Sequence, residues 1–598
     1  MIFSFINRAD LEFQLFEVLN VDALCSRAMY VKHDVTTFKQ VLNTAYDVAT
    51  DFFAPHAALS DAQEPVFNGN NVLLIPEIKR ALDAYSDAGL TGATFAEEFG
   101  GLQLPFIVGQ AANAIFYAAN ISTAAYPLLT VGAANLIAAF GTEEQKKKFL
   151  RPMIDGRWFG TMCLSETQAG SSLADMLTRA TPKSGNEYLI RGSKMWISCG
   201  DHDLSENIVH LVLAKIENAP AGIRGISLFI VPKFLVQPDG QLGRRNGVAL
   251  AGINHKMGYR GTVNTLLNFG EGEDCVGYLV GEAHHGLSYM FQMMNEARIG
   301  VGLGATMCGY AGYMASLQYA RERPQGRHPE SKDPTSAQVP IIQHADVRRL
   351  LLTQKCYVEG ALSLSMYCAF LVDELRTATD ENVKRRAGLL LEVLTPIAKS
   401  WPSEFCLEAN KHAIQVLGGY GYTREFPLER LYRDNRLNAI HEGTHGIQGI
   451  DLLGRKVVML DGAAFAALGA NIFLDIKSAS RHGELSENIK ALSDAWELAE
   501  KVTKLLVKKR SIDLRRALSD SSVYLDMLGH IVISWMWIRQ AATALVGIKI
   551  KPDEKNFYEG KVAACNFFFE RDLPKVRAQA EVLTANNGEH YSINENSF

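Results

Sequence analysis

A glutamate at position 442 has the surroundings that a general base requires. The segment reads Ala439-Ile440-His441-Glu442-Gly443-Thr444-His445-Gly446-Ile447-Gln448, so apolar residues and a histidine precede the carboxylate and a Gly-Thr pair follows it. A carboxylate in a dry site can remove a proton from carbon, because burial raises its pKa toward the working pH. Taken alone, the segment is equally compatible with a glutamate that caps a helix at a turn.

Two further motifs precede this glutamate in a fixed order. Gln415-Val416-Leu417-Gly418-Gly419-Tyr420-Gly421-Tyr422 comes first, and Arg433-Asp434 follows it. The series resembles the acyl-CoA dehydrogenase family, in which GG-x-G, RD and EGT-x-x-IQ carry flavin contacts and the catalytic base. The resemblance covers roughly residues 35 to 460 and extends more loosely to the C-terminal part. It is closest to the longer members with a C-terminal helical extension, the 3-methylmercaptopropionyl-CoA dehydrogenase-like and long-chain fatty acyl-CoA dehydrogenase-like proteins.

The resemblance implies FAD-dependent α,β-dehydrogenation of acyl-CoA thioesters to trans-2-enoyl-CoA, the first step of fatty acid β-oxidation. Glu442 is then the base that takes the α-proton, while the hydride passes from the β-carbon to flavin N5. As in the family, the backbone N–H of Glu442 would donate to the thioester carbonyl and stabilise the developing enolate.

A second region resembles the part of the family that contacts the flavin. Residues 162–172, Met-Cys-Leu-Ser-Glu-Thr-Gln-Ala-Gly-Ser-Ser, are similar to the family segment YCVTEPGAGSD. Thr167-Gln168 replaces Pro-Gly, Met162 replaces an aromatic residue and Ser172 replaces Asp. By this match the flavin and the CoA entrance are lined by Met162, Leu164, Ser165, Gly170 and Ser171. Taken alone, the segment predicts a strand followed by a polar loop.

The tripeptide Trp196-Ile197-Ser198 is similar to the family's WIT or WIS. In the family the tryptophan packs on the flavin and the hydroxyl residue bonds near N5. A tryptophan on a strand is otherwise most often core, because it buries a large area. The distance of about thirty residues from the Ala-Gly-Ser segment favours the functional interpretation.

The remaining cofactor contacts follow from the resemblance alone. Arg323 lies in a segment similar to the family's ER-x-x-FG, where the arginine reaches the FAD diphosphate of the neighbouring subunit. A basic loop of this kind is otherwise usually solvated surface. The other implied FAD contacts are Gln325, Gln343, Gln415, Gly418, Gly419, Gly443, Thr444 and Gln448.

Met294-Asn295-Glu296-Ala297-Arg298 stands where shorter family members carry Asp-x-x-Arg at the pocket. The implied substrate contacts are therefore Asn295 and Arg298, together with Ser171, Glu442 and Gly443. Acyl chain length is left open, since the small residues Gly300, Gly302, Gly304 and Ala305 suit either a long acyl tail or close helix packing.

Composition sets broad limits on the class of protein. A chain of 598 residues is too long for one core, and a net charge of −5 gives no electrostatic case for nucleic acid. The nine cysteines show no metal-binding spacing, so we expect reduced thiols and no metal. The N-terminus lacks a secretory signal and the apolar run 528–548 is interrupted by polar residues, so we expect a buried amphipathic helix, no membrane span and a cytoplasmic protein.

Periodicity predicts a multidomain α+β fold. We expect an N-terminal helical domain (1–157), a central small β-barrel domain (158–281), a four-helix-bundle domain with the catalytic glutamate (282–460) and a C-terminal helical extension (461–598). Phe38, Val41, Leu42, Ala45, Val48, Ala49 and Phe52 predict one buried helix stripe. Thr142 and Gln145 have capping-box spacing. Residues 188–198 predict a strand, a turn and a second strand, and residues 207–216 predict a further strand. Residues 321–338 predict an exposed connection between long helices, and Leu492 and Trp496 belong to a predicted helix face.

The leading hypothesis is an acyl-CoA dehydrogenase that passes electrons to an electron-transfer flavoprotein and forms a homodimer, since the added helical domain can cover the face used for tetramers. Three alternatives stay open: a 3-methylmercaptopropionyl-CoA dehydrogenase, an acyl-CoA oxidase that reduces oxygen, and a catalytically silent assembly partner. The intact Glu442 argues against the last.

Overall fold

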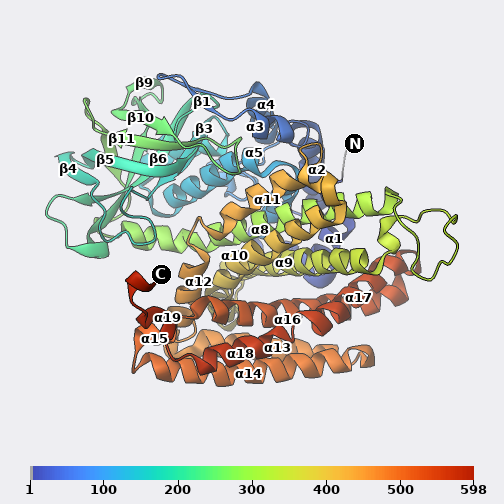
Figure 1. Cartoon of the computed structure of the whole chain (residues 1–598). Helices are drawn as coiled ribbons and strands as arrows, with labels where there is room; N and C mark the ends of the chain where they lie inside the picture. Colours follow the sequence, from blue (N-terminus) through green and yellow to red (C-terminus); the bar gives the residue numbers. More distant parts are fainter. Residues whose placement is uncertain (1–3) are drawn as a thin grey trace. The chain divides into compact units, whose positions relative to one another are not determined.

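A computed structural model describes residues 4–598, apart from the side chains at 292, 293 and 591. Contacts within the chain divide it into two units (Figure 1). Met29–Ala297 contains every strand found in the described residues and is called the barrel unit here. Met1–Ala28 together with Arg298–Phe598 is called the helical unit. The predicted α+β fold with a central barrel is confirmed.

The barrel unit begins with helices that surround the long apolar helix α5. The structure confirms the capping box, in which the Thr142 hydroxyl accepts from the Gln145 backbone N–H and the Gln145 side chain accepts from the Thr142 N–H. The helices of this part are α2 (Val35–Val48), α3 (Ala57–Ala62), α4 (Pro76–Asp87), α5 (Phe106–Phe140), α6 (Glu143–Gln145) and α7 (Arg151–Ile154).

The buried stripe of α2 ends differently from the prediction. Phe38, Leu42 and Ala45 are buried as expected, but Phe52 is exposed and Phe53 is fully buried instead. The reason is a π-helical turn at Ala49–Phe53, which adds residues to one turn and rotates the following side chains onto a new face.

The strands form a small barrel with mixed pairing. Strand order is β10-β11-β5-β12-β7-β6-β3, and β4 pairs with both β5 and β6, which closes a ring. β3 and β4 run parallel to β6, whereas the other pairs are antiparallel. The strands of the barrel are β3 (Trp158–Cys163), β4 (Arg179–Ser184), β5 (Glu187–Ser198), β6 (Asn207–Ile216), β7 (Ile226–Pro232), β10 (Val248–Ile253), β11 (Asn264–Phe269) and β12 (Val276–Leu279). Short hairpins pair β1 (Val66–Phe67) with β2 (Val72–Leu73) and β8 (Phe234–Val236) with β9 (Leu242–Arg245).

Strand β6 separates two apolar cores, because side chains alternate between the two faces of a strand. Leu211 and Leu213 pack with Trp158 and residues of the N-terminal helices, whereas Val212 and Ala214 pack inside the barrel. The predicted strand at 207–216 is confirmed.

The predicted strand, turn and strand at 188–198 is wrong. Glu187–Ser198 is one continuous strand, β5, which pairs with β4 and β12 along its first half and with β11 along its second. Gly192 lies at φ +152°, a backbone conformation that residues with a Cβ rarely adopt, and a Cβ there would lie 2.8 Å from Thr178 Cα, so glycine is required within the continuous strand.

The helical unit is built on three long helices and a C-terminal group. α8 (Gly286–Glu322) begins in the barrel unit, and α9 (Ala345–Thr377) and α10 (Glu381–Leu417) follow after an irregular connection, as predicted. A Cβ on Gly302 would lie 1.9 Å from the Ala398 carbonyl oxygen, so this glycine serves close packing of α8 on α10. The remaining helices are α1 (Arg8–Glu12), α11 (Leu428–Arg436), α12 (His445–Asp451), α13 (Ala463–Ala479), α14 (Ser486–Arg510), α15 (Leu514–Leu518), α16 (Ser521–Ile550), α17 (Lys555–Arg571), α18 (Lys575–Ala585) and α19 (Glu589–Ser592).

Helix α16 is buried more completely than predicted. Residues 527–538 are buried on every side, so the centre of the helix is a core element and not amphipathic. Length and composition alone would allow a membrane span in three helices among the described residues: Phe106–Phe140, Met459–Ala479 and Ser521–Ile550. In the last, 72% of the most apolar stretch is buried inside the protein, so core packing accounts for its hydrophobicity.

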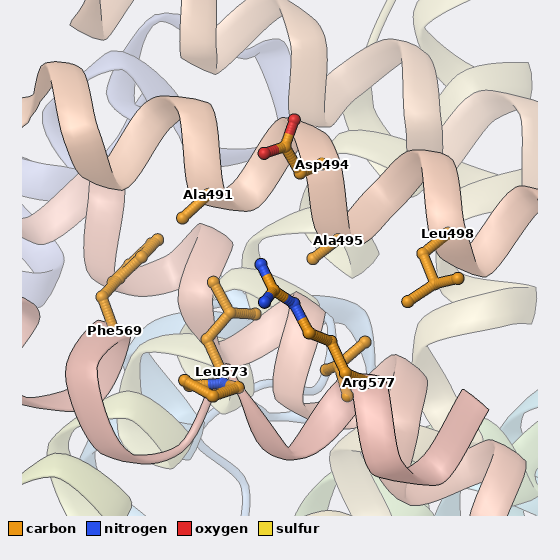
Figure 2. A pocket seen from close by; sticks show the side chains of 9 residues that line it. Ala491, Asp494, Ala495, Leu498, Phe569, Leu573 and Arg577 are labelled. Atoms are coloured by element: carbon orange, nitrogen blue, oxygen red, sulfur yellow. The ribbon is translucent and has the colours of Figure 1, made fainter. Parts of the chain in front are cut away.

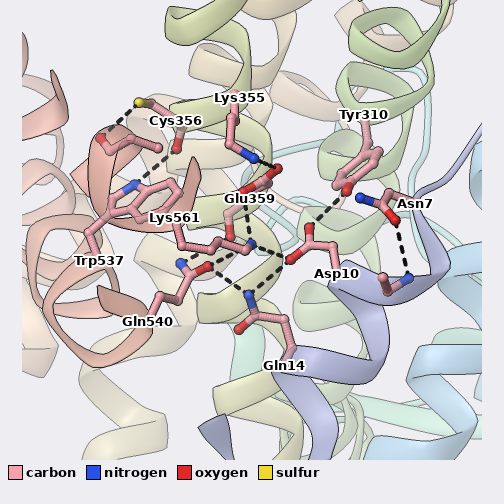
Figure 3. Close-up of polar contacts among 12 residues, drawn as sticks. Asn7, Asp10, Gln14, Tyr310, Lys355, Cys356, Glu359, Trp537, Gln540 and Lys561 are labelled. Carbon is pink, nitrogen blue, oxygen red and sulfur yellow. Dashed lines mark hydrogen bonds and ion pairs between the residues drawn. The ribbon is translucent and has the colours of Figure 1, made fainter. Parts of the chain in front are cut away.

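A buried charged network joins helix α1 to the C-terminal helices (Figure 3). The Lys561 ammonium group on α17 contacts Asp10 on α1, Glu359 on α9 at 2.8 Å and Gln540 on α16 at 3.1 Å. Lys355 pairs with Glu359 from the same helix. The side chains of Lys561, Asp10 and Glu359 are at most 2% exposed, so these charges are balanced by each other and not by solvent.

Candidate active site

Glu442 lies in a strained turn immediately before helix α12. Glu442 and Gly443 both adopt left-handed backbone conformations, at φ +52° and +87°. Thr444 is the N-cap of α12, and its hydroxyl accepts from the Ile447 backbone N–H at 3.3 Å. A left-handed glutamate costs free energy, and such strain persists only where surrounding contacts hold it. The turn is therefore a candidate functional feature, and not a simple helix cap provided by the glutamate.

Gln448 holds this turn from inside. Its side chain is fully buried, and its Nε2 donates to the Glu442 carbonyl oxygen at 3.1 Å. Its Oε1 is buried and has no hydrogen-bond partner among the described residues. The side-chain nitrogen of Gln448 therefore holds the Glu442 turn, and Gln448 Oε1 is the atom available for the predicted contact with FAD.

Lys399 is a site residue that no sequence motif indicated. It lies on α10, is fully buried, and donates from Nζ to the Gly443 carbonyl oxygen at 2.7 Å. The signal available in the sequence was a single lysine within the apolar run Leu394–Trp401, where a charged residue must have a partner.

Electrostatics around the turn act on Glu442 in opposite directions. Burial raises the pKa of Glu442, while the charges of Lys399 and Arg298 lower it and leave a net rise. Burial lowers the pKa of Lys399 to about 7, although the Glu442 carboxylate opposes this. The pKa of His441 is lowered to about 3, mainly by burial, so this imidazole is neutral. A carboxylate with a raised pKa suits proton abstraction.

Arg298 belongs to the same cluster. It is buried, and its Nη1 lies 3.1 Å from Asp451 Oδ2 on α12. Its Nε has no hydrogen-bond partner among the described residues. Asn295 lies three residues earlier on α8 and is half-buried. The geometry thus places Arg298 near the charge of Glu442, and the predicted substrate contacts of both residues stay predictions.

A second group of predicted residues lies on exposed backbone of the helical unit. The Arg323 guanidinium carbon is 5.7 Å from the ring centroid of Tyr420, which follows the glycine pair. Gly418 has φ +60° and ψ −133°, and Cβ atoms at Gly418 and Gly419 would meet no atom within 4 Å. The other members are exposed too: Gln325, Gln343 and Gln415.

These two groups are far apart within one chain. Lys399, beside the Glu442 turn, and Gln415, beside Gly418, both lie on α10 and are sixteen positions apart by their numbers. At 1.5 Å per residue, about 24 Å of helix separates them. One chain therefore does not bring Arg323, Gly418 and Gly419 to Glu442. The contact of Arg323 with the FAD of a neighbouring subunit stays a prediction.

In the barrel unit, Trp196 is held outward by a β-bulge. Ile197 pairs with Thr265 and Lys194 with Leu267, so Met195 and Trp196 oppose the single residue Leu266. Trp196 adopts φ +65° and is 60% exposed in this chain. Bulges of this kind redirect a side chain, and an exposed tryptophan on strained backbone presents an apolar face for a partner or ligand.

A buried ion pair anchors the loop that follows β3 to this strand. Lys194 Nζ contacts Glu166 Oε1 at 3.0 Å and donates to the Leu164 carbonyl oxygen at 3.0 Å. Glu166 also accepts from the backbone N–H groups of Leu177 and Thr178. Burial alone would raise the pKa of Glu166, but Lys194 and these donors lower it to about 2. The pair fixes the loop beside the strand that carries Trp196.

The other predicted residues of the barrel unit lie on this loop and strand. Ser198 is half-buried, and its hydroxyl accepts from Asn264 Nδ2 at 3.1 Å. The Ile197 side chain is in the barrel core, so only its backbone is left for a cofactor. Met162, Leu164 and Ser165 are half-buried, while Gly170 and Ser171 are exposed.

A hollow on the C-terminal helices contains none of the predicted site residues (Figure 2). Asp494 on α14 and Arg577 on α18 flank apolar side chains there. Its lining consists of Ala491, Asp494, Ala495, Leu498, Phe569, Leu573, Pro574, Val576 and Arg577. Across the described part of the chain, no group of three or more His, Cys, Asp or Glu side chains is placed to hold a metal ion.

Four family models match successive parts of the chain. They are the acyl-CoA dehydrogenase N-terminal domain at residues 37–157, its middle domain at 161–271 and its C-terminal domain at 284–457. A model described as acetyl-CoA dehydrogenase C-terminal like matches residues 464–593.

Two relatives are similar along nearly the whole chain. A 3-methylmercaptopropionyl-CoA dehydrogenase of Ruegeria pomeroyi is 36% identical, covering 89% of this chain and 90% of the relative. A broad-specificity linear acyl-CoA dehydrogenase of Mycobacterium tuberculosis, FadE5, is 34% identical and covers 99% of both chains. The solved structure of an acyl-CoA dehydrogenase complexed with FAD from Bacillus anthracis has a TM-score of 0.73 at 23% identity, covering 94% of this chain and 90% of that one.

Proposed function

Because the chain belongs to the acyl-CoA dehydrogenase family of flavin-dependent oxidoreductases, we propose that it oxidises acyl-CoA thioesters between the α and β carbons, with Glu442 as the base. The observation that carries this proposal is the Glu442 turn. Its left-handed backbone is held by Gln448, Lys399 and Thr444, and its carboxyl group has a raised pKa.

In the proposed reaction, a Glu442 carboxylate oxygen takes the α-proton and becomes neutral. The β-carbon loses a hydride, and the electron pair of the α C–H bond becomes the new double bond. Bound FAD supplies the two-electron acceptor for that hydride. The Glu442 backbone N–H would donate to the thioester carbonyl oxygen, where negative charge develops as the proton leaves.

The residues of this chain fit FAD. The exposed Trp196 offers an aromatic face for a planar ring, and the loop that follows β3 beside it is fixed by the Glu166–Lys194 pair. Space around Gly418 and Gly419 lets backbone approach a ligand closely, and Arg323 is an exposed cation suited to a diphosphate. We therefore assign FAD as the cofactor of this chain.

We further propose that FAD is shared across a homodimer and that electrons pass to an electron-transfer flavoprotein. The separation of about 24 Å along α10 between the two groups of the helical unit supports the shared site, because both groups match FAD contacts in the family. The acceptor follows from family membership alone.

The substrate proposed is a linear acyl-CoA. One relative acts on 3-methylmercaptopropionyl-CoA and another on a broad range of linear acyl-CoAs, and both kinds of acyl group are unbranched chains. A sulfur atom in place of a methylene changes the shape of such a chain little, so both are substrates to test.

The test of the proposed function is an assay of purified protein with bound FAD against unbranched acyl-CoAs of graded length, 3-methylmercaptopropionyl-CoA and a branched acyl-CoA. An artificial electron acceptor reports the rate, and mass spectrometry reports the loss of two hydrogens. We expect trans-2-enoyl-CoA products from unbranched substrates. Oxygen consumption that matches product formation without an added acceptor would instead indicate an oxidase, and FAD occupancy without turnover of any thioester would contradict the proposal.

A further inference from the structure

We infer that Lys399 is a positioning residue for the base: its hydrogen bond to the Gly443 carbonyl fixes the turn, and its positive charge keeps Glu442 ionised. This inference rests on the proposed role of Glu442 and adds a residue on a different helix to the active site.

The contact is specific to the peptide that follows the base. Lys399 Nζ lies 2.7 Å from the Gly443 carbonyl oxygen, while Gln448 Nε2 is 3.5 Å from the same oxygen. Lys399 is therefore the strong donor to this carbonyl. Because Glu442 and Gly443 are both left-handed, the direction of the Glu442 side chain depends on how firmly this peptide is held.

No carboxylate in the described part of the chain pairs directly with Lys399, so its positive charge is available to stabilise the ionised form of Glu442. Among the described residues, Lys399 Nζ donates to the Gly443 carbonyl oxygen and forms no ion pair with a carboxylate. Arg298, the other cation that acts on Glu442, is already 3.1 Å from Asp451, which also pairs with Arg455. The charge of Arg298 is thus partly compensated by Asp451, whereas no carboxylate of the described residues pairs directly with Lys399.

The neighbouring titratable groups do not replace this cation. His441 is neutral, and His445 on α12 is engaged by Ser400 at 2.6 Å and by Asp526 of α16 at 3.4 Å. Glu404, five residues further along α10, contributes only a longer-range negative charge to Lys399.

Ionisation matters because a protonated glutamate cannot accept the α-proton. Burial drives Glu442 toward the neutral form, and the nearby cations oppose burial. An opposite charge close to a carboxyl group lowers its pKa by about one unit or more. Lys399 itself loses its proton around neutral pH, since burial lowers its pKa to about 7, so its positive charge is present mainly at and below neutrality.

The experiment compares Lys399→Met, Lys399→Gln and Lys399→Arg as purified proteins with bound FAD. Methionine removes both donor and charge, glutamine keeps a donor without a charge, and arginine keeps both. Lys411→Met is the matched control, since Lys411 lies on the same helix and pairs at the surface with Glu408. Infrared difference spectroscopy follows the protonated carboxyl band of Glu442 against pH without substrate, with Glu442→Gln identifying that band.

A second readout is the pH dependence of flavin reduction after anaerobic mixing with an unbranched acyl-CoA. We expect the infrared midpoint and the acidic limb of the rate profile to move up by about one pH unit in Lys399→Met and Lys399→Gln. Well below the limb, this corresponds to a rate roughly tenfold lower. Lys399→Arg and Lys411→Met are expected to keep the wild-type midpoint.

An unchanged infrared midpoint in Lys399→Met or Lys399→Gln would overturn the inference, as would an equal shift in Lys411→Met. If Lys399→Met does not fold, the infrared midpoint of Glu442 in Lys399→Gln tests the inference. A shifted midpoint in protein that oxidises no thioester would support the electrostatic role of Lys399 while the proposed function fails, so the two failures are distinguishable.

Discussion

Replacing Lys561 by methionine should destabilise the helical unit strongly. The ammonium group contacts Asp10 and Glu359, and none of these side chains is more than 2% exposed. Removal of one partner from a buried ion pair typically costs about 3–5 kcal/mol, because the other charge is left without compensation. In this variant Lys355 still pairs with Glu359 and neutralises part of its charge. The expected loss of unfolding free energy therefore stays within this range and does not double.

The expected shift in melting temperature follows from the size of the unit. Met1–Ala28 and Arg298–Phe598 together hold roughly 330 residues, and unfolding entropy is about 2.1 cal/mol/K per residue. The unit then loses roughly 0.7 kcal/mol of stability per degree near its midpoint, so 3–5 kcal/mol lowers the melting temperature by about 4–7 °C.

The assay is differential scanning calorimetry at neutral pH and at one scan rate, because a protein of this size often unfolds irreversibly. Lys555→Met is the control, since Lys555 lies on the same helix and forms an exposed pair with Glu559.

Burial alone would raise the pKa of Asp10, but Lys561, Lys355 and hydrogen bonds lower it overall. Ionised Asp10 therefore stabilises the fold above its unfolded pKa of about 4, and this contribution is lost as pH falls through the lower folded value.

The difference between wild type and Lys561→Met should accordingly shrink in acid. Adding Asp10→Asn to Lys561→Met should recover part of the lost stability, since it removes a buried carboxylate whose cationic partner is gone. A Lys561→Met melting temperature within 1 °C of the Lys555→Met control would refute this reasoning.

Three further outcomes follow from the site and the assembly. Arg323→Ala should weaken FAD retention by roughly tenfold, the usual effect of one charge-assisted hydrogen bond, and unchanged FAD occupancy after ultrafiltration would count against a diphosphate contact. Light scattering at micromolar concentration should give a homodimer, and a stable tetramer would exclude it. Lys194→Met should expose the loop after β3 to proteolysis, because Glu166 loses its buried cation. Cleavage at the wild-type rate would show that the pair does not hold the loop.

Local sequence patterns predicted many elements correctly, because the interactions involved are close in sequence. The box formed by Thr142 and Gln145 spans three residues, and β6 shows the apolar composition of a strand buried on both faces. On α14, Leu492 and Trp496 are buried at the positions that helical spacing predicts.

Predictions failed where one extra residue or a distant contact decides the geometry. The π-helical turn at Ala49–Phe53 exchanges Phe52 for Phe53, and the bulge at Trp196 changes the pairing of β5 without ending the strand. Neither leaves a periodic signal, since both are set by packing against other elements.

In the candidate site too, residues adjacent in sequence were predictable and a residue distant in sequence was not. Glu442, Gly443 and Thr444 are adjacent, so one motif indicates all three. Lys399 reaches the Gly443 carbonyl from forty-four positions away in sequence, and only the packing of α10 against the turn reveals it. The limits of the four predicted domains stay predictions, as do the individual FAD and substrate contacts.

The most direct test of Glu442 as the base is anaerobic mixing of the Glu442→Gln protein with a saturating unbranched acyl-CoA. Glutamine keeps the shape of the side chain but cannot take a proton, so bleaching of the flavin absorbance should be slower by about 10²–10⁴-fold or more. FAD content and acyl-CoA binding should persist, and Glu497→Gln, an exposed change on α14, serves as the control. Bleaching at the wild-type rate would show that another residue is the base and would contradict the account.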